Sequence, residues 1–177
     1  NQSKIPRLNK LMIAPFQLQR SLIDKVEKTA QAAAQGVASR IILKMNTLTD
    51  EKLMEALVHA GQAGVQIDLI IRGACMLPAQ RPGVTDNIRV RSIIGRFLEH
   101  SRVFYFRTGH DESLYLSSAD WMNRNMLRRV ELAWPVEDAA LRQRVIDECL
   151  VAYLHDNVDA WSLNADGQYT RVQPTKP

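Results

Sequence analysis

The sequence predicts an α/β fold in which a mostly parallel sheet is covered by helices. In the first 71 residues, short apolar runs alternate with longer segments of helical periodicity. The apolar runs show no polar alternation, as expected of strands that are covered on both faces. The chain has 177 residues, of which 46% are hydrophobic and 24% charged, and this is enough apolar material for one core.

The first three elements follow from the spacing of apolar residues. Residues 11–14 form a short apolar run that Pro15 stops, which is typical of a buried strand. From residue 17, apolar side chains recur on one helical face, and Gly36 is placed to end this helix. Residues 41–45 are again apolar and predict a second buried strand.

A second helix and a third strand complete the parallel unit. Thr49 is expected to cap this helix, with two acidic residues in the first turn, and Gly64 is expected to end it. Residues 65–71 predict the next buried strand. Alternation of strand and helix implies right-handed crossovers and a mostly parallel sheet, in which ligands bind beyond the carboxyl ends of the strands.

The second half of the chain has a different character. Residues 73–87 are rich in proline and glycine and predict a loop. A helix is expected over residues 138–154, with Leu141 the first of its inward-facing side chains. Further strands are expected at 88–93, 101–106, 114–116 and 129–134, with a turn at 108–112 and a hairpin joining 161–163 to 169–172.

Charge and cysteine content exclude several classes of protein. The formal net charge is +4, and seven arginines but only two acidic residues lie between residues 72 and 107. Arginine forms paired hydrogen bonds with phosphate oxygens, so this segment indicates an anionic ligand, although a solvated basic face has the same composition.

Cys75 and Cys149 have neither the spacing of a disulfide framework nor that of a zinc site. Without a membrane span or a signal peptide, we expect a piece of a longer cytoplasmic protein.

Polar side chains follow the predicted parallel strands. Lys44 and Asn46 stand at the end of the second strand, and Arg72 directly follows the third. Because carboxyl ends of parallel strands meet at one edge of a sheet, we expect these groups at a phosphate-binding site.

The segment from residue 95 to residue 106 carries the densest chemistry. His100 and Arg102 alternate at the start of a predicted strand, so both side chains can converge on one anion. A histidine transfers protons near neutral pH, and a guanidinium neutralises phosphate charge. Ser117, Ser118 and Asn125 follow another strand and are further candidate donors to phosphate oxygens.

At this point the sequence resembles the last domain of bacterial polyphosphate kinases. The resemblance covers nearly the whole chain, and its longest uninterrupted block runs from residue 88 to residue 102. The other matching segments are Leu-Met-Ile-Ala-Pro-Phe (11–16), Arg-Ile-Ile-Leu-Lys-Met-Asn (40–46), Asp-Leu-Ile-Ile-Arg-Gly (68–73) and Ser-Ala-Asp-Trp-Met (118–122).

The resemblance implies a phospholipase D-like fold, with residues 1–9 as a linker and residues 10–177 as one catalytic domain of a larger kinase. In that family, a histidine of the preceding domain accepts the γ-phosphate of ATP and passes it to a growing polyphosphate chain. An arginine matching Arg72 and a second histidine matching His100 contact the nucleotide phosphates. The accepting histidine and the Mg²⁺ ligands lie upstream, so no metal ligand is expected in this chain.

The implied partners are ATP or ADP, inorganic polyphosphate, the preceding catalytic domain and further copies in a homo-oligomer. Neither nucleic acid nor a transmembrane segment is expected, and the location is cytoplasmic, with peripheral association at the inner membrane left open. This part alone is expected to be inactive because it lacks the accepting histidine. His59, His110 and His155 lie outside the motif and are interpreted as surface or packing residues.

Two other classes of function remain as alternatives. A phospholipase D-type phosphodiesterase or nuclease would use His100 as its nucleophile. The pattern of that class has lysine where Arg102 stands and aspartate where Arg107 stands, and arginine at both positions favours a site for extra negative charge. A basic polyanion-binding module without chemistry would instead stack bases on aromatic residues that otherwise pack in the core, namely Phe97, Phe104, Tyr105 and Phe106.

Overall fold

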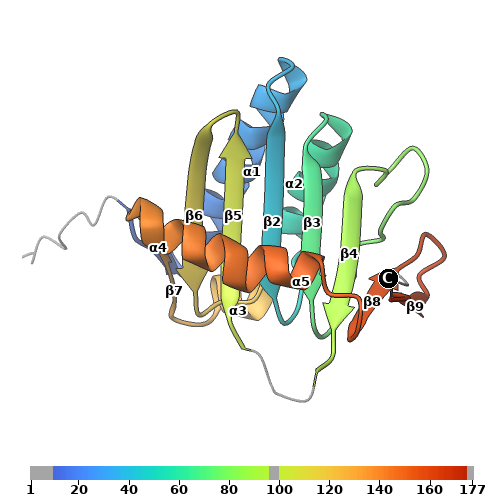
Figure 1. Cartoon of the computed structure of the whole chain (residues 1–177). Coiled ribbons are helices and arrows are strands. Elements are labelled where there is room, and N and C mark those ends of the chain that lie inside the picture. Colours follow the sequence, from blue (N-terminus) through green and yellow to red (C-terminus); the bar gives the residue numbers. More distant parts are fainter. Residues whose placement is uncertain (1–9, 96–99, 175–177) are drawn as a thin grey trace, which may run out of the picture.

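A nine-stranded mixed sheet with helices on both faces makes up the computed structural model, which describes residues 10–95 and 100–174 (Figure 1). The expected linker, residues 1–9, lies outside this part of the chain. The strand order is β1-β7-β6-β5-β2-β3-β4-β8-β9. The strands are β1 (Met12–Ala14), β2 (Ser39–Met45), β3 (Gln66–Ile71), β4 (Ile88–Ile93), β5 (Arg102–Thr108), β6 (Asp111–Ser117), β7 (Glu131–Pro135), β8 (Ala160–Leu163) and β9 (Tyr169–Arg171).

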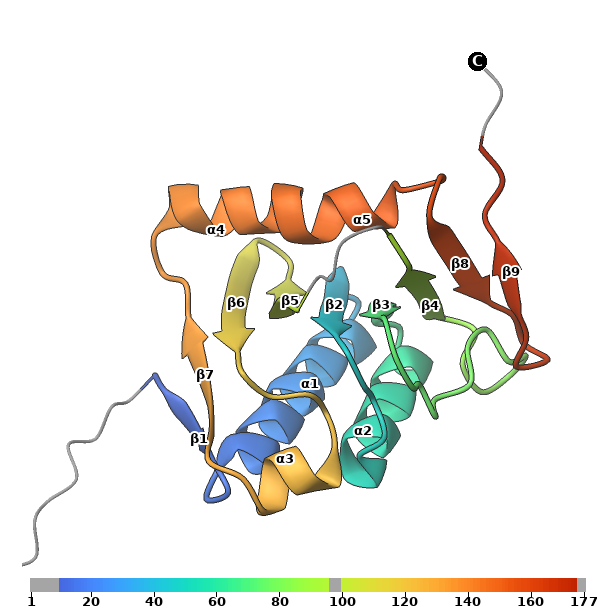
Figure 2. The same cartoon turned by 90° about the horizontal axis from the view of Figure 1, so that it is seen from below.

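Two layers of helices enclose the sheet. Helices α1 (Leu18–Ala34) and α2 (Glu51–Gln62) lie behind it in Figure 1, and the short α3 (Asn123–Leu127) lies at its lower edge. A continuous helix crosses the front, formed by α4 (Ala139–Val145), the π-helical η1 (Ile146–Val151) and α5 (Ala152–Leu154). Figure 2 shows these two layers on opposite sides of the strands. Within the described residues, no helix has the length and apolar character that crossing a membrane requires.

The central strand β2 packs against both helical layers, as its unbroken apolar sequence predicts. Ile41 and Leu43 belong to the core cluster that contains the buried face of α1 and α2. Ile42 points the other way and packs with Ile146 and Leu150 of the front helix. Alternate residues of a strand point to opposite faces, so a strand covered on both sides needs apolar residues at successive positions.

The expectation of a largely parallel sheet is wrong for the flanks. Strands β2 and β3 are parallel neighbours, as the alternation of strands and helices predicts. The expectation is wrong for β1, which pairs antiparallel with β7, and the third parallel strand is β4, which follows β3 after a loop rather than a helix. The remaining pairings are antiparallel, including β5 against β2. Tight turns account for two of these pairings, β5–β6 and β8–β9, since antiparallel strands can be joined by a tight turn whereas parallel strands need a crossover. The turn between β5 and β6 occupies residues 109–110, where Gly109 has a φ of 60°.

Three local expectations are also corrected. Strand β6 begins at Asp111, so the predicted turn at 108–112 is shorter and the strand longer than expected. The N-cap of α2 is Asp50 rather than Thr49, because the Asp50 side chain accepts the N–H of Leu53 at 3.0 Å. Leu141 is 55% exposed, and the buried positions of the front helix are Ile146 and Leu150. The π-helical turn changes the spacing of inward-facing residues from that of a regular α-helix.

The two aspartate caps provide a matched test of helix capping. Asp50 is 1% exposed and also accepts Gln19 Nε2 at 2.9 Å, whereas the exposed Asp138 makes one cap bond to the N–H of Leu141. We expect Asp50→Ala to lower the free energy of unfolding by about 2 kcal/mol and Asp138→Ala by about 1 kcal/mol. Urea unfolding followed by circular dichroism measures both values, and equal losses would contradict the assigned role of Asp50.

Candidate functional site

Several strand ends meet at the lower edge of the sheet in Figure 1. Strands β2, β3 and β6 end at this edge, and β5 and β7 begin there. The strand register places Arg102 opposite Ser117. Side chains that are far apart in the sequence therefore share one edge of the sheet, as the sequence predicts for Arg72, His100 and Arg102.

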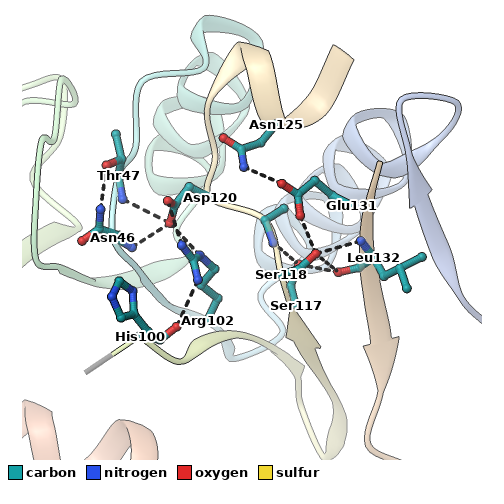
Figure 3. A network of polar contacts seen from close by, with 11 residues as sticks. Asn46, Thr47, His100, Arg102, Ser117, Ser118, Asp120, Asn125, Glu131 and Leu132 are labelled. Carbon is teal, nitrogen blue, oxygen red and sulfur yellow. Dashed lines mark hydrogen bonds and ion pairs between the residues drawn. The ribbon is translucent and has the colours of Figure 1, made fainter. Parts of the chain in front are cut away.

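Asp120 is the central acceptor of this edge (Figure 3). Its Oδ1 accepts the backbone N–H of Asn46 at 2.8 Å and that of Thr47 at 3.3 Å. Arg102 donates to the same carboxylate from Nε at 3.0 Å and from Nη2 at 3.2 Å. The Asp120 side chain is 8% exposed and that of Arg102 is 20% exposed. A nearly buried ion pair thus connects the end of β2 to the start of β5.

His100 is exposed at the same edge, directly before β5. Its carbonyl oxygen accepts a hydrogen bond from Arg102 Nη1 at 3.1 Å. Arg102 therefore holds the backbone of His100 while Asp120 holds Arg102. The exposed imidazole is the part of this arrangement that can reach a ligand in solution.

Arg72 joins this edge through the backbone beside it. The N–H of Gly73 donates to the carbonyl of Asn46 at 2.7 Å, so the end of β3 lies against the end of β2. A Cβ on residue 73 would stand 2.8 Å from that carbonyl oxygen, a separation that real Cβ atoms essentially never show. Glycine is required here by close approach, and it keeps Arg72 next to the segment that Asp120 binds.

Lys44 has a position that differs from the prediction. It lies within β2, is 4% exposed and donates to Ser101 Oγ at 2.8 Å. Its ammonium also stands 3.8 Å from the centroid of the Tyr153 ring, a cation–π contact under the front helix. The hydrogen bond from Lys44 holds Ser101, which is the neighbour of His100. Asn46 is at the edge as predicted, where its backbone N–H donates to Asp120 and its carbonyl accepts the N–H of Gly73.

Ser117, Ser118 and Asn125 form a second polar group beside the first (Figure 3). Glu131, which is 9% exposed, accepts hydrogen bonds from Ser118 Oγ and from Asn125 Nδ2, the latter at 2.8 Å. Ser117 Oγ donates to the carbonyl of Leu132 at 2.8 Å. The side chains that the sequence assigns to phosphate binding thus donate hydrogen bonds to protein acceptors. These bonds connect the end of β6 and α3 to the start of β7.

The sequence reasoning did not single out Asp120 or Glu131. Asp120 lies within the matching segment 118–122, and Glu131 is the acidic residue of the predicted strand 129–134. An isolated carboxylate in either place needs a partner, because burial of an unpaired charge is costly. The need for a partner is the signal that the sequence contains, but the sequence alone does not identify which residue across the sheet is that partner.

The aromatic residues of β5 pack in the core, as the sequence favours. Phe104, Tyr105 and Phe106 are at most 4% exposed, so these three form no stacking platform for bases, and Phe97 lies outside the described residues. The expectation that Arg107 adds charge to the phosphate site is wrong. Arg107 stands at the other end of β5 from Arg102, roughly 17 Å away by the rise of a strand. Arg107 therefore adds no charge to the edge that carries His100.

The residues of this edge do not fit a Mg²⁺ site. In the described parts of the chain, no group of three or more histidine, cysteine or acidic residues could hold a metal ion. The Asp120 and Glu131 carboxylates already accept hydrogen bonds from protein donors. No step of the chemistry is therefore assigned to a metal held by these residues.

Comparison with known proteins gives a consistent family. A family model described as polyphosphate kinase C-terminal domain 2 matches residues 11–177. The polyphosphate kinase of Pseudomonas aeruginosa is 55% identical over 172 residues, which are 97% of this chain and 25% of that protein. The polyphosphate kinase of Paraburkholderia phytofirmans is 48% identical over 170 residues, 96% of this chain and 25% of that protein. The chain spans about a quarter of the length of these relatives.

Solved structures agree with this family and with the expected fold. The crystal structure of polyphosphate kinase from Porphyromonas gingivalis matches with a TM-score of 0.90 and 36% identity, covering 95% of this chain and 26% of that one. Nuc from Salmonella typhimurium, a phospholipase D family member, matches with a TM-score of 0.59 and 13% identity, covering 92% of this chain and 97% of that one. The second likeness shows that the fold is phospholipase D-like.

The Asp120–Arg102 pair should dominate the stability of this edge. Asp120→Ala leaves a nearly buried guanidinium without its carboxylate, and we expect a loss of about 3 kcal/mol in the free energy of unfolding. Asp24→Ala is the matched control, since Asp24 pairs with Arg20 on an exposed face and should cost about 0.5 kcal/mol. Chemical denaturation compares the two, and similar losses would show that Asp120 does not organise the edge.

Proposed function

The chain belongs to the family described as polyphosphate kinase C-terminal domain 2, and we propose that it forms the nucleotide- and polyphosphate-binding half of a polyphosphate kinase active site. The observation that carries this proposal is the exposed His100 at a sheet edge that also carries Arg72 and Arg102. The reaction is the reversible transfer of the ATP γ-phosphate to a growing polyphosphate chain.

Phosphoryl transfer depends chiefly on positioning and on neutralisation of charge. In this proposal, a histidine of the preceding domain accepts the phosphoryl group, so that a covalent intermediate divides the reaction into two steps. His100 contacts the transferring phosphoryl group or donates a proton to the leaving oxygen of ADP. Arg72 binds the nucleotide phosphates through its guanidinium.

Arg102 has two roles in this proposal. Three of its N–H donors bind Asp120 and the His100 carbonyl, out of the five that a guanidinium carries. The remaining two N–H groups can donate to a phosphate oxygen at the exposed side of the edge. Arg102 therefore orients His100 first and contributes charge to the phosphate site second.

The intact enzyme supplies what this chain lacks. We assign Mg²⁺ and its ligands, together with the accepting histidine, to the preceding domain, and we propose a homo-oligomer in the cytoplasm that can associate with the inner membrane. The linker at residues 1–9 and one catalytic domain over residues 10–177 belong to the same proposal. This chain alone should not synthesise polymer.

The alternative functions receive less support. A phosphodiesterase of the phospholipase D type shares the fold, but the aspartate of its pattern is replaced by Arg107, which points to the opposite end of β5. A binding module that stacks bases would need exposed aromatic rings at the edge, and the rings of β5 are buried. A binding module without chemistry also gives no reason for an ion pair that fixes the backbone of an exposed histidine.

His100→Ala in the full-length enzyme tests the proposed function. We expect ATP-dependent polymer synthesis to fall at least about 100-fold, the usual contribution of a general acid or base. His110→Ala is the control, because His110 is exposed in the turn between β5 and β6 at the other edge of the sheet. Initial rates with ATP measure both variants. Near-normal synthesis by the His100 variant would remove this residue from the mechanism.

A further inference from the structure

The front helix leaves part of the sheet uncovered. In Figure 1 it crosses the lower half of the strands, and no helix covers the front of the upper half. Ile42, Ile70 and Tyr105 belong to the cluster that the front helix covers. Because side chains alternate along a strand, Arg40, Asp68 and Arg107, each two residues from one of these, face the same side nearer the upper rim.

This upper rim carries an excess of positive charge. Asp68 accepts hydrogen bonds from Arg40 Nη2 at 3.1 Å and from Arg89 Nε at 2.9 Å. Arg107 is the direct cross-strand neighbour of Arg40, and like charges in that arrangement repel each other. Arg40 and Arg89 therefore share the Asp68 carboxylate, and Arg107 adds a third guanidinium group beside them.

The other nearby carboxylate does not neutralise Arg107. Glu112 is its cross-strand neighbour on β6, but Glu112 accepts the Tyr105 hydroxyl at 2.7 Å and stands 3.7 Å from Arg142 Nε. Burial of the Tyr105 hydroxyl, and to a smaller extent its hydrogen bond to Glu112, raises the pKa of Tyr105 to about 12. The positive charges of Arg107 and Arg40 lower this pKa. Both guanidinium groups thus lie near that hydroxyl. Among the described residues, Arg107 has no ion-pair partner.

A hollow is open to these arginines. It has a volume of about 530 Å³ and is lined by Arg40, Arg89 and Arg107, together with the turns at Gly36 and Gly64. The two glycines have φ values of +82° and +109°, which residues with a side chain rarely adopt. Glycine at both turns means that no side chain from these positions fills the hollow. The Nε atom of Arg107 is buried and finds no hydrogen-bond partner in the described residues. A buried donor without a partner is a mark of a bound water or ion.

A second hollow adjoins the first. Its volume is about 330 Å³, and Arg40 and Arg89 line it as well, together with Arg91 of β4 and His155 at the end of the front helix. Basic side chains therefore continue across the rim from β5 to β4. A ligand with one charge would leave most of these groups unsatisfied, whereas adjacent phosphate groups can pair with several of them.

We propose that the rim formed by Arg40, Arg89 and Arg107 is a second anion site, which binds consecutive phosphate groups of an inorganic polyphosphate chain. The choice of polyphosphate as the ligand rests on the proposed function. The site lies at the opposite end of β5 from Arg102, roughly 17 Å away, and the front helix lies between the two. A long chain can occupy both sites, so the rim would retain the polymer between successive transfers.

The arginine Nε–Hε resonances of the ¹⁵N-labelled chain test this proposal directly. Inorganic tripolyphosphate should shift the resonances of Arg40, Arg89 and Arg107, and Arg107→Gln should raise the dissociation constant about tenfold, the effect of losing one charged hydrogen-bonding pair. Arg144→Gln removes the same charge from the exposed face of α4, where Arg144 pairs with Glu148, and should bind as the wild type does. Backbone amide spectra verify that each variant is folded. Arg107→Lys keeps the positive charge but removes the planar guanidinium group, so it separates the effect of charge from that of paired hydrogen bonding.

The ligands and a second variant distinguish the possible outcomes. Binding should tighten from orthophosphate to tripolyphosphate to longer chains, and ATP should bind the rim more weakly than tripolyphosphate. Equal binding by orthophosphate, equal binding by ATP, or an unchanged dissociation constant in Arg107→Gln would each overturn the proposal. His100→Ala should leave the rim titration unaltered. If the full-length enzyme with His100→Ala still synthesises polymer while the rim still binds tripolyphosphate, only the proposed function would be contradicted.

Discussion

The Asp120 carboxylate is the interaction on which the arrangement of the site depends. It accepts two backbone N–H groups after β2 and two N–H groups of Arg102 at the start of β5. Nearly buried charges are tolerated when they are paired and fully hydrogen-bonded, and they then fix the relative position of the segments that carry them. Arg102 connects Asp120 to the backbone of His100. Asn46 connects Asp120 to the end of β3, through the hydrogen bond between its carbonyl and the N–H of Gly73. An edge assembled from five strand ends thereby presents one exposed imidazole in a defined place.

The arginines of the chain are divided between two ends of the sheet. Arg72 and Arg102 stand at the lower edge, whereas Arg89 and Arg107 stand at the upper rim. Arg91 has a structural role, because its Nη1 donates to the carbonyl of Tyr153 at 2.7 Å and ties β4 to the front helix. A single basic site, which the concentration of arginine in the sequence suggests, is therefore the wrong interpretation. Strand β5 runs from the lower edge to the upper rim, so Arg102 and Arg107 stand at opposite ends of the sheet although they are five positions apart in the sequence.

The elements of the fold were predictable where one local pattern decides them. The apolar runs of β2 and β3 and the helical face of α1 are in the sequence, and so is the parallel pairing of β2 with β3. The β8–β9 hairpin was also predicted, from its turn residues. The antiparallel pairings between strands that are distant in the sequence were missed, because no local pattern says which strands meet across the sheet. Strand-end chemistry predicted the position of Arg72, His100 and Arg102. It did not predict that Arg102 is bound to Asp120, since that pair joins residues 18 positions apart across two strands.

A crystal structure of the full-length enzyme with a non-hydrolysable ATP analogue tests the central claim most directly. The account predicts phosphate oxygens within hydrogen-bonding distance of the His100 imidazole and the Arg72 guanidinium, with Arg102 still bound to Asp120. Phosphates bound elsewhere, with His100 facing solvent, would contradict the account. So would an Arg102 side chain that has left Asp120 to bind the nucleotide while His100 keeps its place, because the ion pair would then not be what positions the histidine.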